Sequence, residues 1–372
     1  MQSVLFVISD LDYGSAARQL TLLAAHLPRE TFALRVCILG SEAPWVETLR
    51  QAGLEVEVLD WRRPFDFFPL LALRRRLRSM RPEVVHVWGW AARRALALVG
   101  WRGRARLIVS APLYPGDAAA WADRWLLRRA PLVTAFTAGE AERYRGLGVA
   151  ADRVVALTPA VAPAILQESA SMEPAASLPP GARVLLGIGP MRPYKCFRDA
   201  VWALDILHYQ YDDLQLVLVG DGPDRDALAT FVHATESPGR VHFTGAVPEI
   251  TPWLRRADVI WITGRGGGTC VALEAMAAGK PIVASRIPGP ADLIADGVNG
   301  YLVEPGDKTT LARQTSLLLD DADRRRQFGD EGRRRATAHT VQRLVRDFAA
   351  LYCDTERTHP KSTKTIKKMV KE

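Results

Sequence analysis

The chain has 372 residues, of which 48% are hydrophobic and 24% are charged, and its formal net charge is +8. This composition is typical of globular proteins, and the length predicts about two domains. No apolar run approaches the roughly 20 residues that a membrane-spanning helix needs, and the first residues, MQSVLFVISDLDYG, lack the basic region of a secretory signal. The cysteines have no metal-ligand spacing, which also favours a reducing cytoplasm: Cys37, Cys196, Cys270 and Cys353.

Half of the net charge lies near the C-terminus, where residues 355–372 contain six basic and two acidic side chains. We predict a basic, disordered tail over residues 354–372, because this segment has few apolar side chains. The rest of the chain is only mildly basic, so no nucleic-acid partner is predicted. It contains just three lysines: Lys195, Lys280 and Lys308. Lysine is a compact point charge and arginine a planar fork, so a lysine in a loop can mark a functional position.

The first half of the chain alternates short apolar runs with helical patterns, which is typical of a parallel sheet covered by helices. A helix is predicted over Ala16–Leu27, directly after a turn-prone segment. Because ligands of such sheets bind at the carboxyl ends of the strands, Gly14 and Ser15 are candidates for backbone contact with a ligand. The predicted strands are Val4–Ile8, Leu34–Leu39, Val56–Leu59, Val84–Val87, Leu107–Ser110, Leu132–Phe136 and Val154–Leu157.

The same pattern begins again after residues 168–181, which are rich in Ser, Ala and Pro and predict a linker. The second series of strands is Arg183–Ile188, Leu214–Val219, Val241–Thr244, Val259–Ile262 and Gly300–Val303. We therefore predict an α/β fold of two doubly wound, Rossmann-like domains, residues 1–167 and 182–338, which face a central ligand-binding cleft. A last helix over residues 339–353 is expected to cross back to the first domain.

The densest signal is the stretch ADVIWITGRGGGTCVALEAMAAGKPIVA, residues 257–284. An apolar strand is followed by four glycines between residues 264 and 268 and then by a helix that Thr269 is placed to cap. Strand, glycine loop and helix N-terminus predict a site for an anion, because free backbone N–H groups and the helix dipole converge there. Glu274 lies about one turn inside this helix among small and apolar residues, so we expect it to accept hydrogen bonds.

An amphipathic segment, Phe65–Met80, allows two interpretations. Its apolar residues alternate with arginines, as in a helix that lies on an anionic membrane. An ordinary core helix with a solvated basic face has the same pattern, and we favour this interpretation. Contact with an anionic membrane, through Phe67–Arg78 or through the basic tail, nevertheless stays open, and with it a location at the inner face of the membrane.

Five motifs of the second half occur in the order typical of one enzyme family. They are GPMRPYKC (189–196), LVGDGPDRDAL (218–228), VHFTGAVPEI (241–250), LEAMAAGKPIVAS (273–285) and ADGVNGYLVEPGD (295–307). Through them the chain resembles the retaining GT-B glycosyltransferases of family four, and the first half resembles them more loosely. The resemblance implies transfer of a sugar from a nucleotide diphosphate sugar to an unknown glycan, lipid or small-molecule acceptor, with retention and without a metal or other cofactor.

The resemblance also assigns roles to individual residues. Lys195 would bind the donor diphosphate, Glu274 would accept hydrogen bonds from the ribose hydroxyls, and the main chain near Val247 would contact the base. The remaining candidates belong to the loops at the same strand ends. They are Gly14, Ser15, Gly189, Arg192, Gly266, Gly267, Gly268, Thr269 and Cys270, of which the last three would turn their N–H groups toward the phosphates.

The chain also departs from the family pattern. The first carboxylate of the Glu, seven residues, Glu motif is replaced by Gly266, the arginine of the diphosphate loop by Pro190, and the glycine after the lysine by Cys196. Residues 110–114, SAPLY, lack the histidine that many relatives have there. His86 lies in an apolar strand, where a structural role is favoured over a catalytic one.

These departures leave a second hypothesis open, a catalytically weak or inactive protein that still binds nucleotide-sugars. Gly266 and Pro190 favour it, whereas Lys195, Glu274 and the intact helix start favour an active transferase. An epimerase of GT-B architecture is a third possibility, which agrees less well with the motif set.

Overall fold

The structure, a computed structural model, describes residues 1–11, 14–61, 67–100, 105–110, 121–166, 178–236 and 238–354. Most of the predicted linker and nearly all of the predicted tail lie outside these residues. The strands of the first domain are β1 (Gln2–Ile8), β2 (Phe32–Ile38), β3 (Glu55–Val58), β4 (Val84–Trp88), β5 (Arg106–Ser110), β6 (Leu132–Ala135) and β7 (Val154–Ala156). Its helices are α1 (Ser15–His26), α2 (Pro44–Gln51), α3 (Phe67–Met80), α4 (Trp90–Leu98), α5 (Trp121–Arg128), α6 (Ala138–Gly146) and α7 (Pro163–Leu166).

The second domain repeats this construction. Its strands are β8 (Arg183–Ile188), β9 (Leu214–Val219), β10 (Val241–Gly245), β11 (Val259–Ile262), β12 (Ile282–Ser285) and β13 (Gly300–Val303). The helices that follow or separate them are α8 (Phe197–Leu207), α9 (Arg225–His233), α10 (Thr251–Arg256), α11 (Thr269–Ala277), α12 (Pro290–Leu293), α13 (Lys308–Asp320), α14 (Ala322–Ala336) and α15 (Val341–Cys353).

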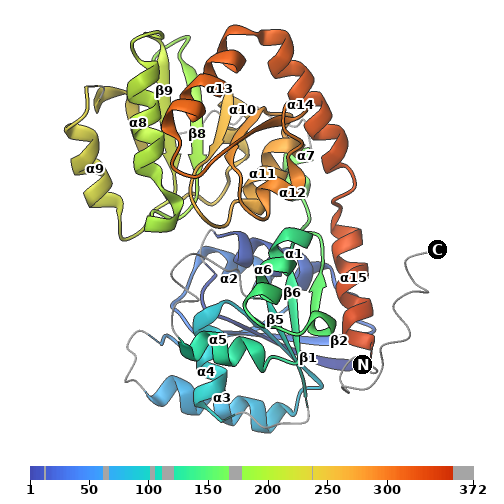
Figure 1. Ribbon diagram of the computed structural model, residues 1–372. Coiled ribbons are helices and arrows are strands. Elements are labelled where there is room, and N and C mark those ends of the chain that lie inside the picture. The colour runs from blue at the N-terminus through green and yellow to red at the C-terminus, as the bar shows by residue number, and fades with distance from the viewer. Residues whose placement is uncertain are drawn as a thin grey trace.

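All strand pairs within the two sheets are parallel, and the predicted α/β fold is confirmed. The strand orders are β3-β2-β1-β4-β5-β6-β7 and β10-β9-β8-β11-β12-β13. In each sheet the order reverses beside the first strand of its domain, and in doubly wound folds ligands bind at the carboxyl edge of that switch point. Figure 1 shows the two domains one above the other, with these edges turned toward their common interface.

The central strands are buried on both faces because helices cover both sides of each sheet. β4 and β9 are buried along their whole length, as their mainly apolar sequences predict. β3 is an edge strand and carries two glutamates, which fits a strand with one unpaired edge. β12 was not among the predicted strands, because its four residues after Gly279 and Pro281 give too short an apolar run to be distinguished from a loop.

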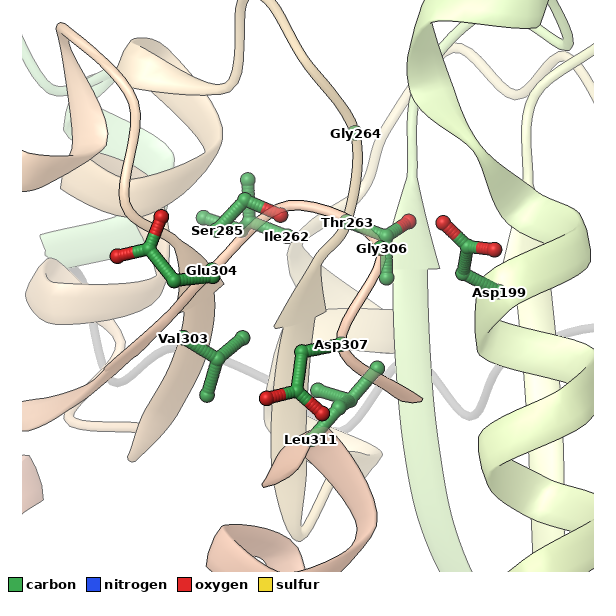
Figure 2. A pocket seen from close by; sticks show the side chains of 10 residues that line it. All are labelled: Asp199, Ile262, Thr263, Gly264, Ser285, Val303, Glu304, Gly306, Asp307 and Leu311. Atoms are coloured by element: carbon green, nitrogen blue, oxygen red, sulfur yellow. The ribbon is translucent and has the colours of Figure 1, made fainter. Parts of the chain in front are cut away.

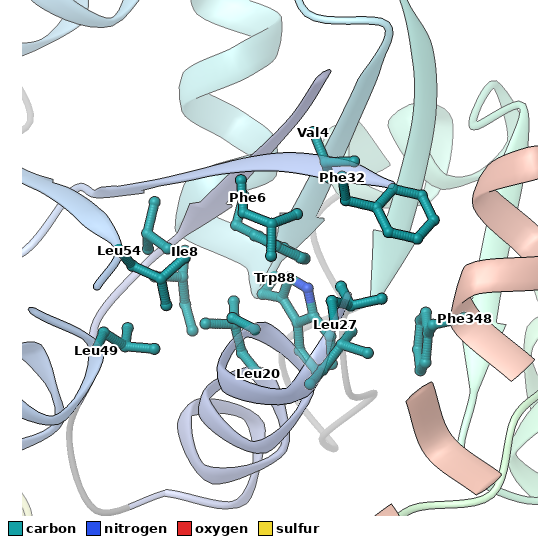
Figure 3. Close-up of a cluster of buried hydrophobic side chains, with 14 of the residues drawn as sticks. Val4, Phe6, Ile8, Leu20, Leu27, Phe32, Leu49, Leu54, Trp88 and Phe348 are labelled. Atoms are coloured by element: carbon teal, nitrogen blue, oxygen red, sulfur yellow. The ribbon is translucent and has the colours of Figure 1, made fainter. Parts of the chain in front are cut away.

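The last helix, α15, packs on the first domain although it follows the second in sequence (Figure 1). Its apolar side chains join the cluster formed by β1, β2, α1 and α2, where Phe348 lies near Leu27 and Trp88 (Figure 3). The amide of Gln2 donates a hydrogen bond of 2.9 Å to the carbonyl of Tyr352, at the end of the same helix. The first domain is therefore completed by residues from the end of the chain.

Candidate active site at the domain interface

Two helix N-termini, one from each domain, meet at the interface. α1 begins at Ser15, directly after its N-cap residue Gly14, and α11 begins at Thr269, directly after its N-cap residue Gly268. Arg18 in the first turn of α1 donates a hydrogen bond of 2.5 Å to Glu274 in α11, and Ser15 lies close enough to the Cys270 thiol to oppose the rise of its pKa that burial causes, so the two helices are in contact. Glycine at both N-caps leaves the first N–H groups without a side-chain acceptor from that position. Because these N–H groups and two helix dipoles converge, the interface is suited to bind an anion such as a diphosphate.

Gly268, not Thr269, is the N-cap of α11, so the predicted capping role of Thr269 is wrong. Gly268 has a φ of 94°, and a Cβ at this position would lie 2.5 Å from Cγ2 of Ile262, which excludes a capping side chain. Thr269 is instead the first helical residue, and its hydroxyl donates a hydrogen bond of 2.5 Å to Oε1 of Glu140 in the first domain. No sequence pattern indicates this contact, because the two residues lie 129 positions apart.

Glu140 belongs to the start of α6, a second place where the domains touch. Its Oε2 accepts a hydrogen bond of 3.0 Å from the N–H of Phe136, and the N–H of the adjacent Gly139 donates to Oδ1 of Asp292 at 3.1 Å. Burial raises the pKa of Glu140, while the hydrogen bond from Thr269 opposes that effect. Sequence reasoning missed Glu140, since nothing in the AGEAE segment distinguishes it from a surface residue.

Lys195 lies beyond the carboxyl end of β8 and is only 5% exposed. Gly189 makes room for it, because its φ is 147° and a Cβ there would lie 2.7 Å from Cε of the lysine. Burial lowers the pKa of Lys195 to about 8, the nearby Cys270 thiol opposes this, and no carboxylate contributes among the described residues. Lys195 is thus mostly protonated at pH 7 and adds positive charge next to the first turn of α11.

The backbone conformation at Cys196 explains why the family pattern has a glycine after the lysine. Its φ of 50° and ψ of 40° are left-handed, a conformation that glycine adopts freely and that costs other residues roughly 1–2 kcal/mol. The loop therefore keeps a backbone suited to glycine although this chain carries a side chain at that position. The Cys196 thiol donates a hydrogen bond of 3.4 Å to the carbonyl of Pro193.

Glu274 accepts a hydrogen bond, as the sequence predicted, but its partner in this structure is an arginine of the first domain. Nη1 of Arg18 lies 2.5 Å from Oε1 of Glu274, and both side chains are buried. Burial alone would lower the pKa of Arg18, but the carboxylate of Glu274 outweighs it and the pKa is raised. Burial raises the pKa of Glu274 against the opposing effect of Arg18.

Four further candidates lie in loops near this interface. Gly266 is buried and Gly267 half-buried between β11 and α11, whereas Val247 is half-buried after β10 and Arg192 is exposed ahead of Lys195. In the described part of the chain, φ is positive at Gly267 but not at Gly266, so the backbone at position 266 accepts a side chain. The donor contacts assigned to these four residues stay predictions.

His86 has a structural role. It is fully buried, Nδ1 lies 2.6 Å from the hydroxyl of Tyr352, and Nε2 lies 2.8 Å from Oγ of Ser110, which in turn bonds to Thr134. Burial lowers the pKa of His86 to about 3, so the imidazole is neutral throughout the physiological range. The chain of four polar side chains ties α15 to three strands of the first sheet.

A small pocket lies at the carboxyl ends of β11, β12 and β13 (Figure 2). Its volume of about 10 Å³ is room for roughly one water molecule, which is too little for a nucleotide. Three carboxylates line it, from Asp199, Glu304 and Asp307. Among the residues with described positions, no three His, Cys, Asp or Glu side chains are grouped so as to hold a metal ion. The helix N-termini at the domain interface are therefore the better candidate site.

Comparison with protein families divides the chain into the same two halves. Residues 171–335 match the model of the glycosyl transferases group 1, and residues 14–160 match the model of the glycosyl transferase 4-like domain. The first match contains Lys195, Glu274 and the glycine loop, and the second contains Ser15, Arg18 and Glu140. Both sides of the helix pair therefore fall within the matched regions.

Among individual relatives, the chain is 30% identical to N-acetyl-alpha-D-glucosaminyl L-malate synthase of Bacillus anthracis over 174 residues, which are 46% of this chain and 45% of that protein. It is 31% identical to 2-deoxystreptamine glucosyltransferase of Streptomyces kanamyceticus over 210 residues, 54% of each chain. The chain thus matches about half the length of these curated relatives.

Among solved structures, the chain is similar to Anabaena Alr3699/HepE in complex with UDP and glucose, with a TM-score of 0.79 and 18% identity over 94% of this chain and 99% of that one. It is also similar to WaaG, a glycosyltransferase involved in lipopolysaccharide biosynthesis, with a TM-score of 0.73 and 16% identity over 94% and 100% of the two chains. At these identities the likeness establishes the fold.

Proposed function

We propose that this chain, whose two halves match glycosyltransferase family models and whose fold is that of GT-B glycosyltransferases, transfers a sugar from a nucleotide diphosphate sugar to an acceptor. The donor would bind mainly to residues 182–338 and the acceptor mainly to residues 1–167. The observation that carries the proposal is the meeting of two glycine-capped helix N-termini beside the buried Lys195. This arrangement provides positive potential at one place without a metal ion.

The chemistry that needs this charge is cleavage of the bond between the anomeric carbon and the diphosphate oxygen. As the bond breaks, negative charge grows on the leaving diphosphate, and the N–H groups of α11 together with Lys195 stabilise it. The acceptor hydroxyl attacks the face that the diphosphate leaves, and its proton passes to the leaving phosphate oxygen. The new glycosidic bond then has the configuration of the donor, and no protein residue has to act as the base.

Glu274 would bind the ribose hydroxyls of the donor. Its carboxylate already pairs with Arg18, so the ribose either shares this carboxylate or displaces the arginine. In both cases, nucleotide binding is coupled to a contact that holds the two domains together. This coupling supports a role for Arg18 in positioning Glu274.

Uridine diphosphate sugars are the first donors to test, because the similar Alr3699/HepE was crystallised with UDP and with UDP-glucose. The relatives act on different acceptors by name, so the acceptor has to be found by experiment. A cytoplasmic location stays a prediction. Contact with an anionic membrane is a separate proposal that rests on α3.

The experiment that tests the proposal measures nucleotide release from a panel of nucleotide-sugars, with and without lipid, glycan and small-molecule acceptors. We expect release with at least one donor, and its loss in Lys195→Met. Tight nucleotide binding without sugar loss under every condition would support the inactive alternative. Gly266→Glu restores the family carboxylate, and a rate increase in this variant would show that Gly266 limits the wild type.

A further inference from the structure

Helix α3 exposes large apolar side chains at one end. Phe67 is 65% exposed, Phe68 83% and Leu71 56%, whereas Leu70 and Leu73 are buried against the first sheet. The helix contributes to the core, and it also presents phenylalanines to solvent, which an ordinary solvated face would not require.

The exposed residues lie on one face of the helix. Phe67, Phe68, Leu71, Arg74, Arg75 and Arg78 follow the three- and four-residue spacing of a single helical stripe, which we call the α3 face. The helix contains no acidic residue. Among the described residues, no carboxylate pairs with the three arginines of this face, whereas Arg76 on the flank binds Glu57 at 2.6 Å. The α3 face thus joins apolar side chains to available positive charge.

Two other helices of the first domain also carry exposed apolar side chains. Leu98 at the end of α4 is 65% exposed, and α3 and α4 cover the same face of the first sheet. α4 contacts α5, where Trp125 is 47% exposed and the guanidinium of Arg129 lies 4.0 Å from the centre of its ring. A hollow of about 510 Å³ beside α3 is lined by Leu71, Ala72, Arg75, Arg76, Ser79 and Glu57. Exposed tryptophan with arginine is typical of membrane interfaces.

We propose that the α3 face docks the protein on the surface of an anionic lipid bilayer. Its phenylalanines and leucine would enter the boundary between headgroups and acyl chains, and its arginines would bind lipid phosphates. A bilayer fits better than an acidic protein, because the face combines exposed apolar side chains with arginines, and α3 lies at the end of the first domain away from the second domain, where a flat surface can approach it (Figure 1). In the described part of the chain no helix is long and apolar enough to cross a membrane.

The test is binding of the full-length protein to vesicles, measured by flotation. We expect binding to vesicles of phosphatidylcholine with 30% phosphatidylglycerol (about a third anionic lipid) and much weaker binding to phosphatidylcholine alone. Phe67→Ser with Phe68→Ser and Leu71→Ser should weaken binding at least about tenfold. Arg74→Gln with Arg75→Gln and Arg78→Gln should weaken it roughly 100-fold, about fivefold for each arginine.

Matched controls change similar residues elsewhere on the protein. Trp202→Ser with Ile206→Ser removes two half-exposed apolar side chains of α8, and Arg326→Gln with Arg334→Gln and Arg346→Gln removes the same net charge from exposed positions. Both should bind vesicles like the wild type, and circular dichroism should show all variants folded. Equal binding by the α3 variants and the wild type would overturn the proposal. Loss of vesicle binding in the arginine control, or failure of the wild type to bind vesicles, would also overturn the proposal. Because vesicle binding is measured without a donor, its failure leaves the transferase proposal untouched.

Discussion

Replacing Lys195 by methionine should weaken donor binding and stabilise the fold at the same time. The ammonium is buried, and its pKa is lowered to about 8 from the ordinary value of 10.5. One pKa unit corresponds to about 1.4 kcal/mol, so holding this charge in the donor-free protein costs about 3 kcal/mol at pH 7. Methionine has a similar length and no charge. We therefore expect the free energy of unfolding to rise by up to about 3 kcal/mol.

The pH dependence of this difference follows from the direction of the pKa change. Below pH 8 the lysine is protonated in both the folded and the unfolded state, so the full cost is present. Between pH 8 and 10.5 the folded protein loses the proton first, and the stability difference between Lys195→Met and the wild type should shrink. Urea unfolding at pH 7 and pH 10 measures this change.

Donor binding should respond in the opposite direction. In the complex the diphosphate offsets the cost of the buried ammonium, so Lys195→Met should bind the donor identified by nucleotide release more weakly by about 3 kcal/mol, on the order of 100-fold. Wild-type affinity should fall above pH 8, and the variant should lack this dependence. Isothermal titration calorimetry measures both effects.

Lys280→Met is the matched control, because burial also lowers the pKa of Lys280 and its Nζ donates a hydrogen bond to the carbonyl of Arg255. This variant should keep the donor affinity of the wild type. If Lys195→Met bound the donor as tightly as the wild type, Lys195 would not belong to the donor site. If Lys195→Met were less stable than the wild type at pH 7, the argument from the buried charge would be refuted.

Three further outcomes are expected. Glu274→Ala leaves the Arg18 guanidinium buried without its carboxylate, so urea unfolding should show that the free energy of unfolding falls by about 3 kcal/mol. Calorimetry should show that the variant no longer binds UDP more tightly than its 2′,3′-dideoxy analogue. If this preference were retained, Glu274 would not belong to the ribose site. Cys196→Gly relieves a left-handed backbone and should stabilise the fold by about 1 kcal/mol, whereas a lower urea midpoint would contradict the strain argument. The pKa of His86 is lowered from 6.5 to about 3, so the folded protein should lose stability as the pH falls from 6.5 toward 3. Nuclear magnetic resonance should show no titration of its ring between pH 5 and 8, and a titration near 6.5 would contradict its burial.

Much of the fold could be predicted because local sequence determines it. β8, β9, β11 and β13 begin and end at the predicted residues, since each is an apolar run bounded by turn residues. The predicted N-cap of α11 was one residue too late. A helix capped by a threonine and a helix capped by the glycine before that threonine have similar sequences. Only the φ of 94° at Gly268 distinguishes them.

The contacts across the domain interface could not be predicted in this way. Arg18 and Glu274 lie 256 positions apart, and no periodicity relates a residue in the first helix to one in the second domain. The sequence indicated that Glu274 needs a hydrogen-bond donor but not which group provides it. The meaning of Cys196 likewise required its backbone angles, because a cysteine in a loop gives no sign of a left-handed conformation.

The central claim is that the helix N-termini and Lys195 bind a nucleotide diphosphate sugar whose sugar is then transferred. The most direct measurement is nuclear magnetic resonance of the anomeric proton during a reaction of the wild type with its best donor and acceptor, run beside Lys195→Met. We predict that the donor signal is replaced by a product signal of the same anomeric configuration in the wild type, and that it persists in the variant. A donor signal that persists in both, or disappears equally fast in both, would contradict the claim.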